Sequence, residues 1–232
     1  MAQNQYFPLT IKGAIMNYAH LLEAVASDLA EDKNRKHYSV RLMIPKVKSD
    51  GTPNEEAARV LERVNTFVDT IFLGHAGNNA AGAQRMKQAL IDKNGGVVIK
   101  DGDALYDKAK KDLDAAPDFE DYKKKFRAAE KVKGYYLIHA KTLESNGRPA
   151  LVDGKLVSVS EERIPNLFYN GATVNANVTI GGYDYNGSKG ATCYLNALQF
   201  VAATEPIQGN DPLAGFEVID DKPAGGDIGS LI

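Results

Sequence analysis

The last third of the sequence alternates apolar and polar residues in short runs separated by Asn-Gly pairs, and this pattern constrains the fold most. From Ala172 to Ile180 every second residue is Ala, Val or Ile, and the residues between them are Thr or Asn. Successive side chains of a β-strand point to opposite faces, so this run predicts a strand with one buried face. Asn-Gly is a strong signal for a tight turn and occurs at 146–147, 170–171 and 186–187. The pattern predicts four strands, at residues 134–142, 150–159, 172–183 and 191–201.

The first half of the chain mixes strand and helix patterns. Alternation predicts a strand at 37–45, with Val40, Leu42 and Ile44 on one face and Arg41 and Met43 on the other. Apolar residues recur three and four positions apart after Pro53, which predicts a long amphipathic helix ending near residue 74. The remaining expected segments are a strand at 7–18, a helical or irregular stretch at 21–29, a helix near 84–91, a strand at 97–100, a turn at 101–103 and a polar helical segment at 104–133 broken at Pro117.

These elements predict a mainly β fold with α insertions, of the α+β class. Five or six short strands are too few for a two-sheet sandwich and favour a small closed barrel, with the helices packed on or beside it. We expect one domain at residues 1–203, with helical insertions at about 53–133. Residues 204–232 are rich in Pro, Gly and Asp, which predicts a disordered tail.

The net charge of −2 is unevenly distributed along the chain. Residues 205–232 contain six acids and one lysine, which leaves 27 basic and 24 acidic residues in residues 1–204. The chain therefore has a mildly basic body and an acidic tail. The N-terminus lacks the pattern of a secretion signal, and no run approaches the roughly 18 apolar residues of a membrane span. Together with the single cysteine, Cys193, these features predict a cytoplasmic protein without a membrane partner.

Motifs of common enzyme classes are absent from the sequence. There is no phosphate-binding Gly-Lys-Ser/Thr loop, no Gly-x-Ser-x-Gly and no His-Glu-x-x-His, and the four histidines are scattered. Asp101 and Asp103 could hold a cation, but an Asp-Gly-Asp cluster is more often a turn. Cys193 lies within an apolar strand, as expected of a small core residue. The sequence therefore predicts a protein that is not an enzyme and has no metal or cofactor.

Interleaved aromatic and basic residues point instead to a binding function. Single-stranded DNA is bound by cations that contact its phosphates and by flat side chains that stack on its bases. Of Tyr135 and Tyr136, alternation places one in the core. The lysine-rich stretch 122–133 is either a solvated helix face or a set of phosphate contacts at the mouth of a groove. The candidate DNA-binding residues are Arg41, Lys100, Lys124, Arg127, Tyr135, Tyr136, Lys141, Arg148, Tyr169, Tyr183, Tyr185 and Lys189, of which Tyr183 and Tyr185 are favoured for stacking.

Several segments, in one order across most of residues 9–202, resemble the OB-fold single-stranded-DNA-binding proteins of tailed phages. They include Gly134-Tyr135-Tyr136-Leu137-Ile138-His139-Ala140-Lys141, Arg148-Pro149-Ala150-Leu151-Val152-Asp153, Phe168-Tyr169-Asn170-Gly171 and Tyr183-Asp184-Tyr185-Asn186-Gly187-Ser188-Lys189-Gly190. Residues 13–22, the strand ending in Ile44-Pro45-Lys46 and Lys100-Asp101-Gly102-Asp103 fit the same pattern. The lysine-rich segment 104–133 departs from it, because it is longer than is usual in that family.

The resemblance implies a five-stranded OB-fold-like barrel that binds single-stranded DNA without strong sequence preference during phage DNA replication or recombination in the host cytoplasm. It also implies that the tail recruits replication or recombination proteins, through Asp220, Asp221, Asp227, Leu231 and Ile232. The alternative reading is a phage structural or assembly protein whose barrel makes protein contacts. A homodimer is one oligomeric state that the sequence leaves open.

Overall fold

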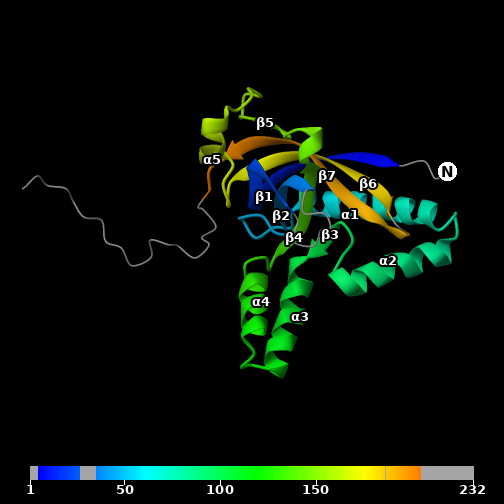
Figure 1. The fold of residues 1–232 in the computed structure, drawn as a ribbon. Helices are drawn as coiled ribbons and strands as arrows, with labels where there is room; N and C mark the ends of the chain where they lie inside the picture. The colour runs from blue at the N-terminus through cyan, green and yellow to red at the C-terminus, as the bar shows by residue number, and fades with distance from the viewer. Residues whose placement is uncertain (1–4, 27–34, 186, 205–232) are drawn as a thin grey trace, which may run out of the picture.

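The computed structural model describes residues 5–26, 35–185 and 187–204, with Tyr185 described by its backbone alone. Within these residues, five strands form a closed barrel (Figure 1). They are β1 (Tyr6–Ala26), β2 (Lys36–Pro45), β4 (Tyr135–Leu143), β6 (Thr173–Tyr185) and β7 (Ser188–Ala202). Their order is β4-β2-β1-β6-β7, and a parallel pairing of β4 with β7 closes the ring while the other barrel pairings are antiparallel. This is the strand order of an OB-fold barrel, so the predicted fold class is confirmed.

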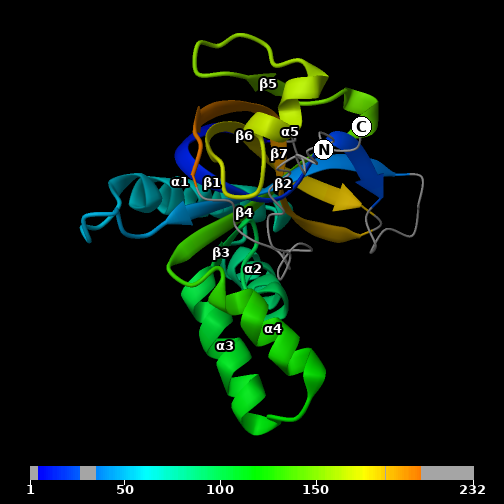
Figure 2. The ribbon, with the colours of Figure 1, turned by 90° about the vertical axis from the view of Figure 1, so that its left-hand side faces the viewer.

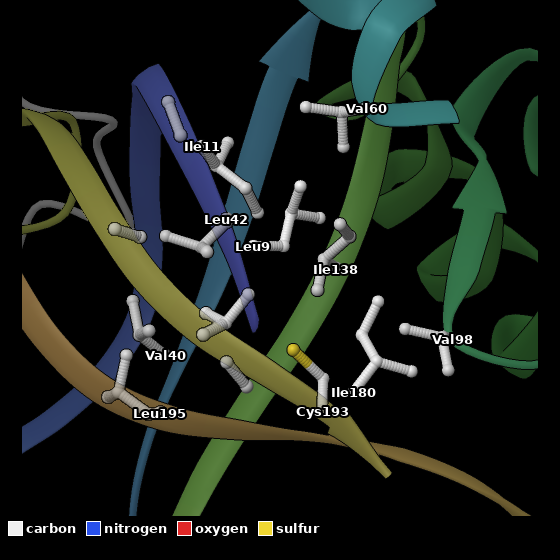
Figure 3. Packing of buried hydrophobic residues seen from close by; sticks show 14 of the residues in the cluster. Leu9, Ile11, Val40, Leu42, Val60, Val98, Ile138, Ile180, Cys193 and Leu195 are labelled. Carbon is white, nitrogen blue, oxygen red and sulfur yellow. The ribbon is translucent and has the colours of Figure 1, made fainter. Parts of the chain in front are cut away.

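The inward faces of the strands form a core that α1 (Glu55–His75) closes at one end of the barrel (Figure 3). Alternation places Val40, Leu42 and Ile44 of β2 inside, as the sequence predicts. The buried stripe of α1 includes Val60 and Val64, which belong to the same cluster as the strand residues. The helix begins at Asn54, whose side chain accepts a hydrogen bond from the Glu56 N–H.

Strand β1 is long and bent, and it pairs with β6 through its first half and with β2 through its second half. The register shifts after Ile11 and again after Asn17, where Gly13 and Tyr18 have positive φ angles of 62° and 47°. Such bulges increase the local twist and let one strand belong to both sides of a small barrel. The expected helical or irregular stretch at 21–29 is wrong for residues 21–26, because they continue β1; residues 27–29 lie outside the described residues.

Helices α2 (Ala80–Asn94), α3 (Gly102–Ala115) and α4 (Glu120–Glu130) fill the insertion between β2 and β4, together with the short strand β3 (Ile99–Asp101). Strand β3 pairs with β4. Helices α3 and α4 form a hairpin, called the arm below, which projects away from the barrel (Figure 2). The break expected at Pro117 falls between its two helices.

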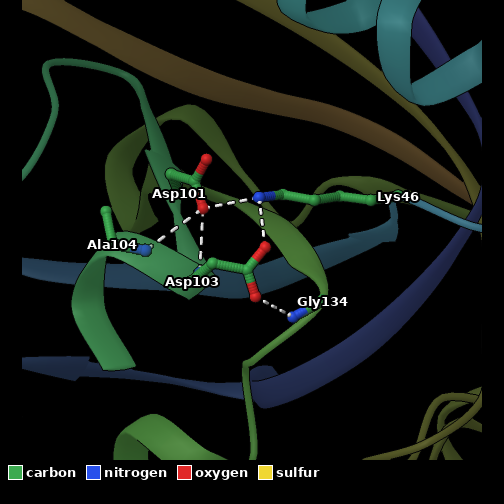
Figure 4. A network of polar contacts seen from close by, with 5 residues as sticks. All are labelled: Lys46, Asp101, Asp103, Ala104 and Gly134. Carbon is green, nitrogen blue, oxygen red and sulfur yellow. Dashed lines mark hydrogen bonds and ion pairs between the residues drawn. The ribbon is translucent and has the colours of Figure 1, made fainter. Parts of the chain in front are cut away.

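The base of the arm is fixed by an ion-pair network around Lys46, which follows β2 (Figure 4). The Lys46 ammonium lies 2.6 Å from Asp101 Oδ1 and 2.7 Å from Asp103 Oδ2. Asp101 also caps α3, and Asp103 Oδ1 accepts a hydrogen bond from the Gly134 N–H, where the chain returns from α4 to the base of the arm. The Asp-Gly-Asp cluster is therefore the end of β3 and the start of a helix, and not the simple turn expected from the sequence.

The segment between β4 and β6 differs from the expectation of a long strand at 150–159. Strand β5 is confined to Ala150–Val152 and pairs in parallel with β7. Asp153 then organises a tight loop by accepting hydrogen bonds from the Lys155 and Val157 N–H groups. Because β4 and β5 do not pair with each other, Asn146-Gly147 joins no hairpin, whereas 186–187 connects β6 to β7. The short helix α5 (Ile164–Leu167) precedes β6, and none of the described helices is long and apolar enough to cross a membrane.

Candidate nucleic-acid interface

A groove of about 640 Å³ lies between the outer face of the barrel and the arm. The sheet wall comes from β2, β3, β4 and the start of β7, and the arm wall comes from one face of each helix. One acid, Asp112, lines it among the described residues. We call it the basic groove after its cationic lining residues, which are Arg41, Lys100, Lys108, Lys125 and Lys141, joined by His139.

Strand register brings the cations of the sheet wall together. Arg41 of β2 is the Cα partner of His139 of β4, so their side chains lie on the same outward face. Two residues further along β4, Lys141 is on that face as well. Lys100 of β3 pairs with Leu137 and continues the row toward the arm. Arg41, Lys100 and Lys141, which are far apart in the sequence, therefore form one positive strip.

The pKa values of the lysines in this strip are set by burial and by neighbouring cations. Burial and the neighbouring Arg41 lower the pKa of Lys100, and burial and Arg35 lower the pKa of Lys141. In the described part of the chain, neither lysine nor Arg41 makes an ion pair with an acid. Lys46 shows the opposite case: burial alone would lower its pKa, but the hydrogen bonds that it donates to Asp101 and Asp103 outweigh burial and raise the pKa. The basic groove is thus a place where positive charges repel one another until an anion arrives.

His139 lies at the centre of the strip, and the same positive charges act on its pKa. Its pKa is lowered by partial removal from water and then by Lys141, Arg41, Lys100 and His20. The side chain remains accessible, but the concave walls of the groove exclude much of the surrounding water. His37, at the other end of β2, has a pKa lowered by burial, Lys141 and Arg35.

An exposed tyrosine stands at one border of the positive strip. Tyr18 occupies the second bulge of β1, and its side chain is 54% exposed. The Arg41 guanidinium lies 4.6 Å from the centre of its ring. The Asn17 side chain accepts a hydrogen bond from the Tyr18 N–H and supports the left-handed backbone. The strain of a non-glycine residue at positive φ is typical of a binding site, and here it presents a flat ring beside a cation.

At the other border of the positive strip lies a surface formed by Tyr6, Tyr183 and Tyr194, called the tyrosine surface below. The register pairs Tyr194 of β7 with Lys141 of β4, which joins this surface to the basic groove. Tyr6 and Tyr194 lie 6.3 Å apart between ring centres, and a Cβ on Gly181 would come within 3.0 Å of both rings. The Tyr183 ring similarly lies over Gly190. The two glycines leave room for aromatic rings to lie against the sheet with one side open to solvent.

Four of the predicted DNA-binding residues are in or beside this region. Arg41, Lys100 and Lys141 line the basic groove, and Tyr183 belongs to the tyrosine surface. Tyr185 is in β6 at the adjoining hairpin, where only its backbone is described.

The other predicted residues lie elsewhere in the fold. Tyr136 packs inward on the main core, and Tyr135 packs on a smaller cluster containing Met43. Arg148 donates to Glu161 and to the Leu22 carbonyl, and the Tyr169 hydroxyl donates to the Thr204 carbonyl.

Lys189 points toward α1, where it donates to the His75 carbonyl. Lys124 and Arg127 are exposed on α4 and do not line the groove, although Lys125 between them does. The tail residues from Asp220 to Ile232 lie outside the described residues.

Several residues of the region were not predicted from the sequence. They are Tyr6, Tyr18, Arg35, Lys108 and Tyr194. Lys125 lies in the stretch 122–133, for which phosphate contacts were one of two predicted roles, and His139 lies in the segment 134–141 that carries the family resemblance. Tyr194 could have been found, since it alternates with the apolar residues of its strand. Tyr18 could not, because a bulge breaks the alternation of β1 at that position.

The structure also gives a role to the two groups considered for other chemistry. Asp101 and Asp103 bind the Lys46 ammonium, and the described residues contain no cluster of three or more His, Cys, Asp or Glu arranged for a metal ion. Cys193 is in the core, where burial raises the pKa of its thiol to about 12. Such a thiol is not a nucleophile at neutral pH.

Comparison with known proteins assigns the family. The model of the Enterobacter phage Enc34 ssDNA-binding protein family matches residues 8–223. The chain belongs to this family. The match includes the arm and all of the barrel except the first two residues of β1, and it confirms the resemblance to phage single-stranded-DNA-binding proteins that the sequence motifs indicated.

Two solved structures of one phage protein share the fold, and a third structure scores lower. The single-stranded DNA-binding protein of bacteriophage Enc34 in complex with ssDNA has a TM-score of 0.57 and 17% identity over 87% of this chain and 89% of that chain. A second structure of the bacteriophage Enc34 single-stranded DNA-binding protein has a TM-score of 0.56 and 16% identity over 90% of this chain and 88% of that chain. Bacteriophage T7 gp2.5, a single-stranded DNA binding protein, has a TM-score of 0.48 and 15% identity, covering 94% and 97%. No curated protein sequence matches this member of the family.

Proposed function

We propose that this protein binds single-stranded DNA along the basic groove and the tyrosine surface, with little preference for sequence. The observation that carries the proposal is a row of cations without ion pairs to any described acid, which lies between Tyr18 and the tyrosine surface. A single strand offers phosphates on one side and bases on the other, which matches that arrangement. The Enc34 protein has been solved in complex with ssDNA, and this chain shares its fold.

Phosphate groups would supply the negative charge that the groove lacks. In the free protein Arg41 repels Lys100 and Arg35 repels Lys141, so a phosphate bound beside them both attracts these cations and relieves that repulsion. Binding of this kind releases counterions and weakens steeply as salt is added.

Bases would stack on the tyrosines that border the groove. Tyr18, Tyr183 and Tyr194 offer accessible rings, and stacking contributes about 1–3 kcal/mol per base regardless of which base it is. The lysines and arginine contact the backbone, which is the same for every sequence. The activity is binding alone, without a catalytic step or a cofactor, and we place it in phage DNA replication or recombination in the host cytoplasm. In this proposal residues 1–203 bind the DNA and residues 204–232 recruit other replication or recombination proteins.

A fluorescence titration with labelled oligo-dT and with a duplex, repeated over a salt series, tests the function. We expect strong preference for the single strand and a linear fall of log K with log salt. The triple variant Arg41→Ala, Lys100→Ala, Lys141→Ala should lose most of the affinity, and Lys155→Ala, an exposed lysine on the loop after β5, should retain it. Equal binding of duplex and single strand, or full affinity of the triple variant, would refute the proposal.

A further inference from the structure

The arm carries basic and aromatic residues that neither the barrel fold nor the ion-pair network at its base explains. Leu105, Lys108, Ala109 and Asp112 recur on one face of α3, and Lys125, Ala128 and Ala129 recur on one face of α4. Both faces line the basic groove, opposite the sheet wall. The alanines keep the groove open at this wall, because a larger side chain at those positions would project into it.

Lys108 and Lys125 of the arm line the groove, as Lys100 and Lys141 of the sheet do. In the described residues Lys108 makes no ion pair, and Lys125 contacts the Tyr122 ring at 5.4 Å from its ammonium to the ring centre. Lys123, on the same helix, is by contrast paired with Glu120 at 2.8 Å. Lys125, the cation of α4 that lines the groove, thus makes no ion pair with any of the described acids.

The end of the arm continues from the groove as a pair of aromatic rings. Tyr122 lies between Lys125 and Phe119, with 4.9 Å between the centres of the Phe119 and Tyr122 rings. Phe119 is at the N-cap position of α4, where its side chain makes no capping hydrogen bond, and it is 52% exposed. An apolar ring left in water at the tip of a projecting hairpin, next to a row of cations, has the composition of a base-stacking site.

We infer that the arm is the second wall of the DNA site: Lys108 and Lys125 contact phosphates from the side opposite the barrel, and Tyr122 and Phe119 stack on bases beyond it. This inference rests on the proposed function and extends it to residues outside the barrel. The ion pairs of Lys46 with Asp101 and Asp103 hold both ends of the arm and so fix the width of the groove. A strand that crosses the barrel is thereby held between two walls and guided outward along α4.

The phosphate contacts are tested by salt dependence, with oligo-dT longer than about 16 nucleotides, the upper range of an OB-fold site. Lys108→Ala with Lys125→Ala should reduce the slope of log K against log salt by about 1.4, since each phosphate contact on a single strand contributes about 0.7. The control is Lys110→Ala with Lys111→Ala, which removes the same charge from exposed positions of α3 that do not line the groove. Equal slopes for the two double variants would overturn the inference.

The stacking contact is tested with a tryptophan reporter, because the chain contains no tryptophan. In Phe119→Trp, oligo-dT should quench the tryptophan emission in step with binding. Val157→Trp, on the exposed loop after β5 at the opposite end of the molecule from the arm, should be unaffected (Figure 1). Unchanged emission at position 119 while the oligonucleotide is bound would overturn the inference that bases stack at the tip. Failure of the unaltered protein to bind oligo-dT would instead refute the proposed function.

Discussion

The lysines of the groove illustrate a conflict between folding and binding at the scale of single residues. Lys141 is half-buried beside other cations, and the fall in its pKa means that the folded state disfavours its charge. The charge therefore costs stability in the free protein, and the cost is recovered only when an anion binds. Sites of this kind commonly become more stable when their functional residues are replaced.

Replacing Lys141 by methionine should separate the two effects. Lys141→Met keeps an unbranched side chain and removes the charge, so we expect the free energy of unfolding to rise by about 0.5–2 kcal/mol. The same change should reduce the salt slope of oligo-dT binding by about 0.7. Lys155→Met, at an exposed position, should stay within about 0.5 kcal/mol of the unaltered protein. A destabilised Lys141→Met protein would contradict this account of the groove.

His139 should make both stability and binding depend on pH. Its pKa is lowered in the folded protein, so below pH 6.5 the unfolded chain takes up a proton more readily and stability falls as the pH falls. Phosphates in the groove favour the protonated ring, so DNA binding should take up a proton and strengthen as the pH is lowered from 7.5 to about 6.

The histidine effects can be measured with His139→Gln. This variant should lose less stability than the unaltered protein between pH 7 and pH 5.5, and its DNA affinity should rise less over the same range. Thermal unfolding and oligo-dT titration at constant salt are the measurements. Identical pH profiles for the two proteins would show that other groups, such as His37, dominate.

At the scale of elements, alternation predicted the strands that have one buried face, and it failed where the backbone is irregular. The strand containing Val40 and Leu42 and the outward position of Arg41 followed from period two alone. The bulges at Gly13 and Tyr18 shift that period, so neither the full length of β1 nor the exposure of Tyr18 could be predicted. Amphipathic spacing predicted α1, because the helix buries one regular stripe against the core.

Glycine in the arm gives a prediction for an element. Gly102 is at the first turn of α3, and a Cβ there would be 1.9 Å from the Val132 carbonyl oxygen, where the two ends of the arm meet. Gly102→Ala should therefore destabilise the protein by about 1–3 kcal/mol, although alanine normally favours a helix. In Gly82→Ala the nearest contact is an ordinary 3.4 Å, so this control in α2 should be neutral or stabilising by up to about 1 kcal/mol. Urea unfolding measures the stability of both variants. Equal stability of the two would contradict the close approach of the Val132 carbonyl to residue 102.

At the scale of the whole molecule, the number of strands favoured a closed barrel but could not show how it closes. The parallel pairing of Ala140 with Cys193 joins strands that are more than fifty residues apart in the chain. No local pattern encodes such a pairing. The groove was unpredictable for the same reason, since its two walls come from the barrel and from an insertion whose direction depends on Lys46.

The uneven charge of the chain gives a prediction for the whole molecule. We propose that residues 205–232, which lie outside the described residues, compete with DNA for the basic groove through their six acids. A chain ending at Thr204 should bind oligo-dT at least as tightly as the full chain, and more tightly at low salt. Replacing Asp220, Asp221 and Asp227 by asparagine in the full chain should reproduce part of that gain. A large loss of affinity in the truncated chain would contradict the competition.

The anchoring of both ends of the arm at Lys46 also has an evolutionary consequence. Because Asp103 and Gly134 are joined by a hydrogen bond, the arm leaves and re-enters the fold at nearly the same point. A segment inserted between adjacent points can lengthen or shorten without altering the path of the remaining chain, and the entropy of closing a longer loop rises only slowly with its length. We therefore expect relatives to differ most in size at this position, and to change the reach of their DNA contacts while their barrels stay the same.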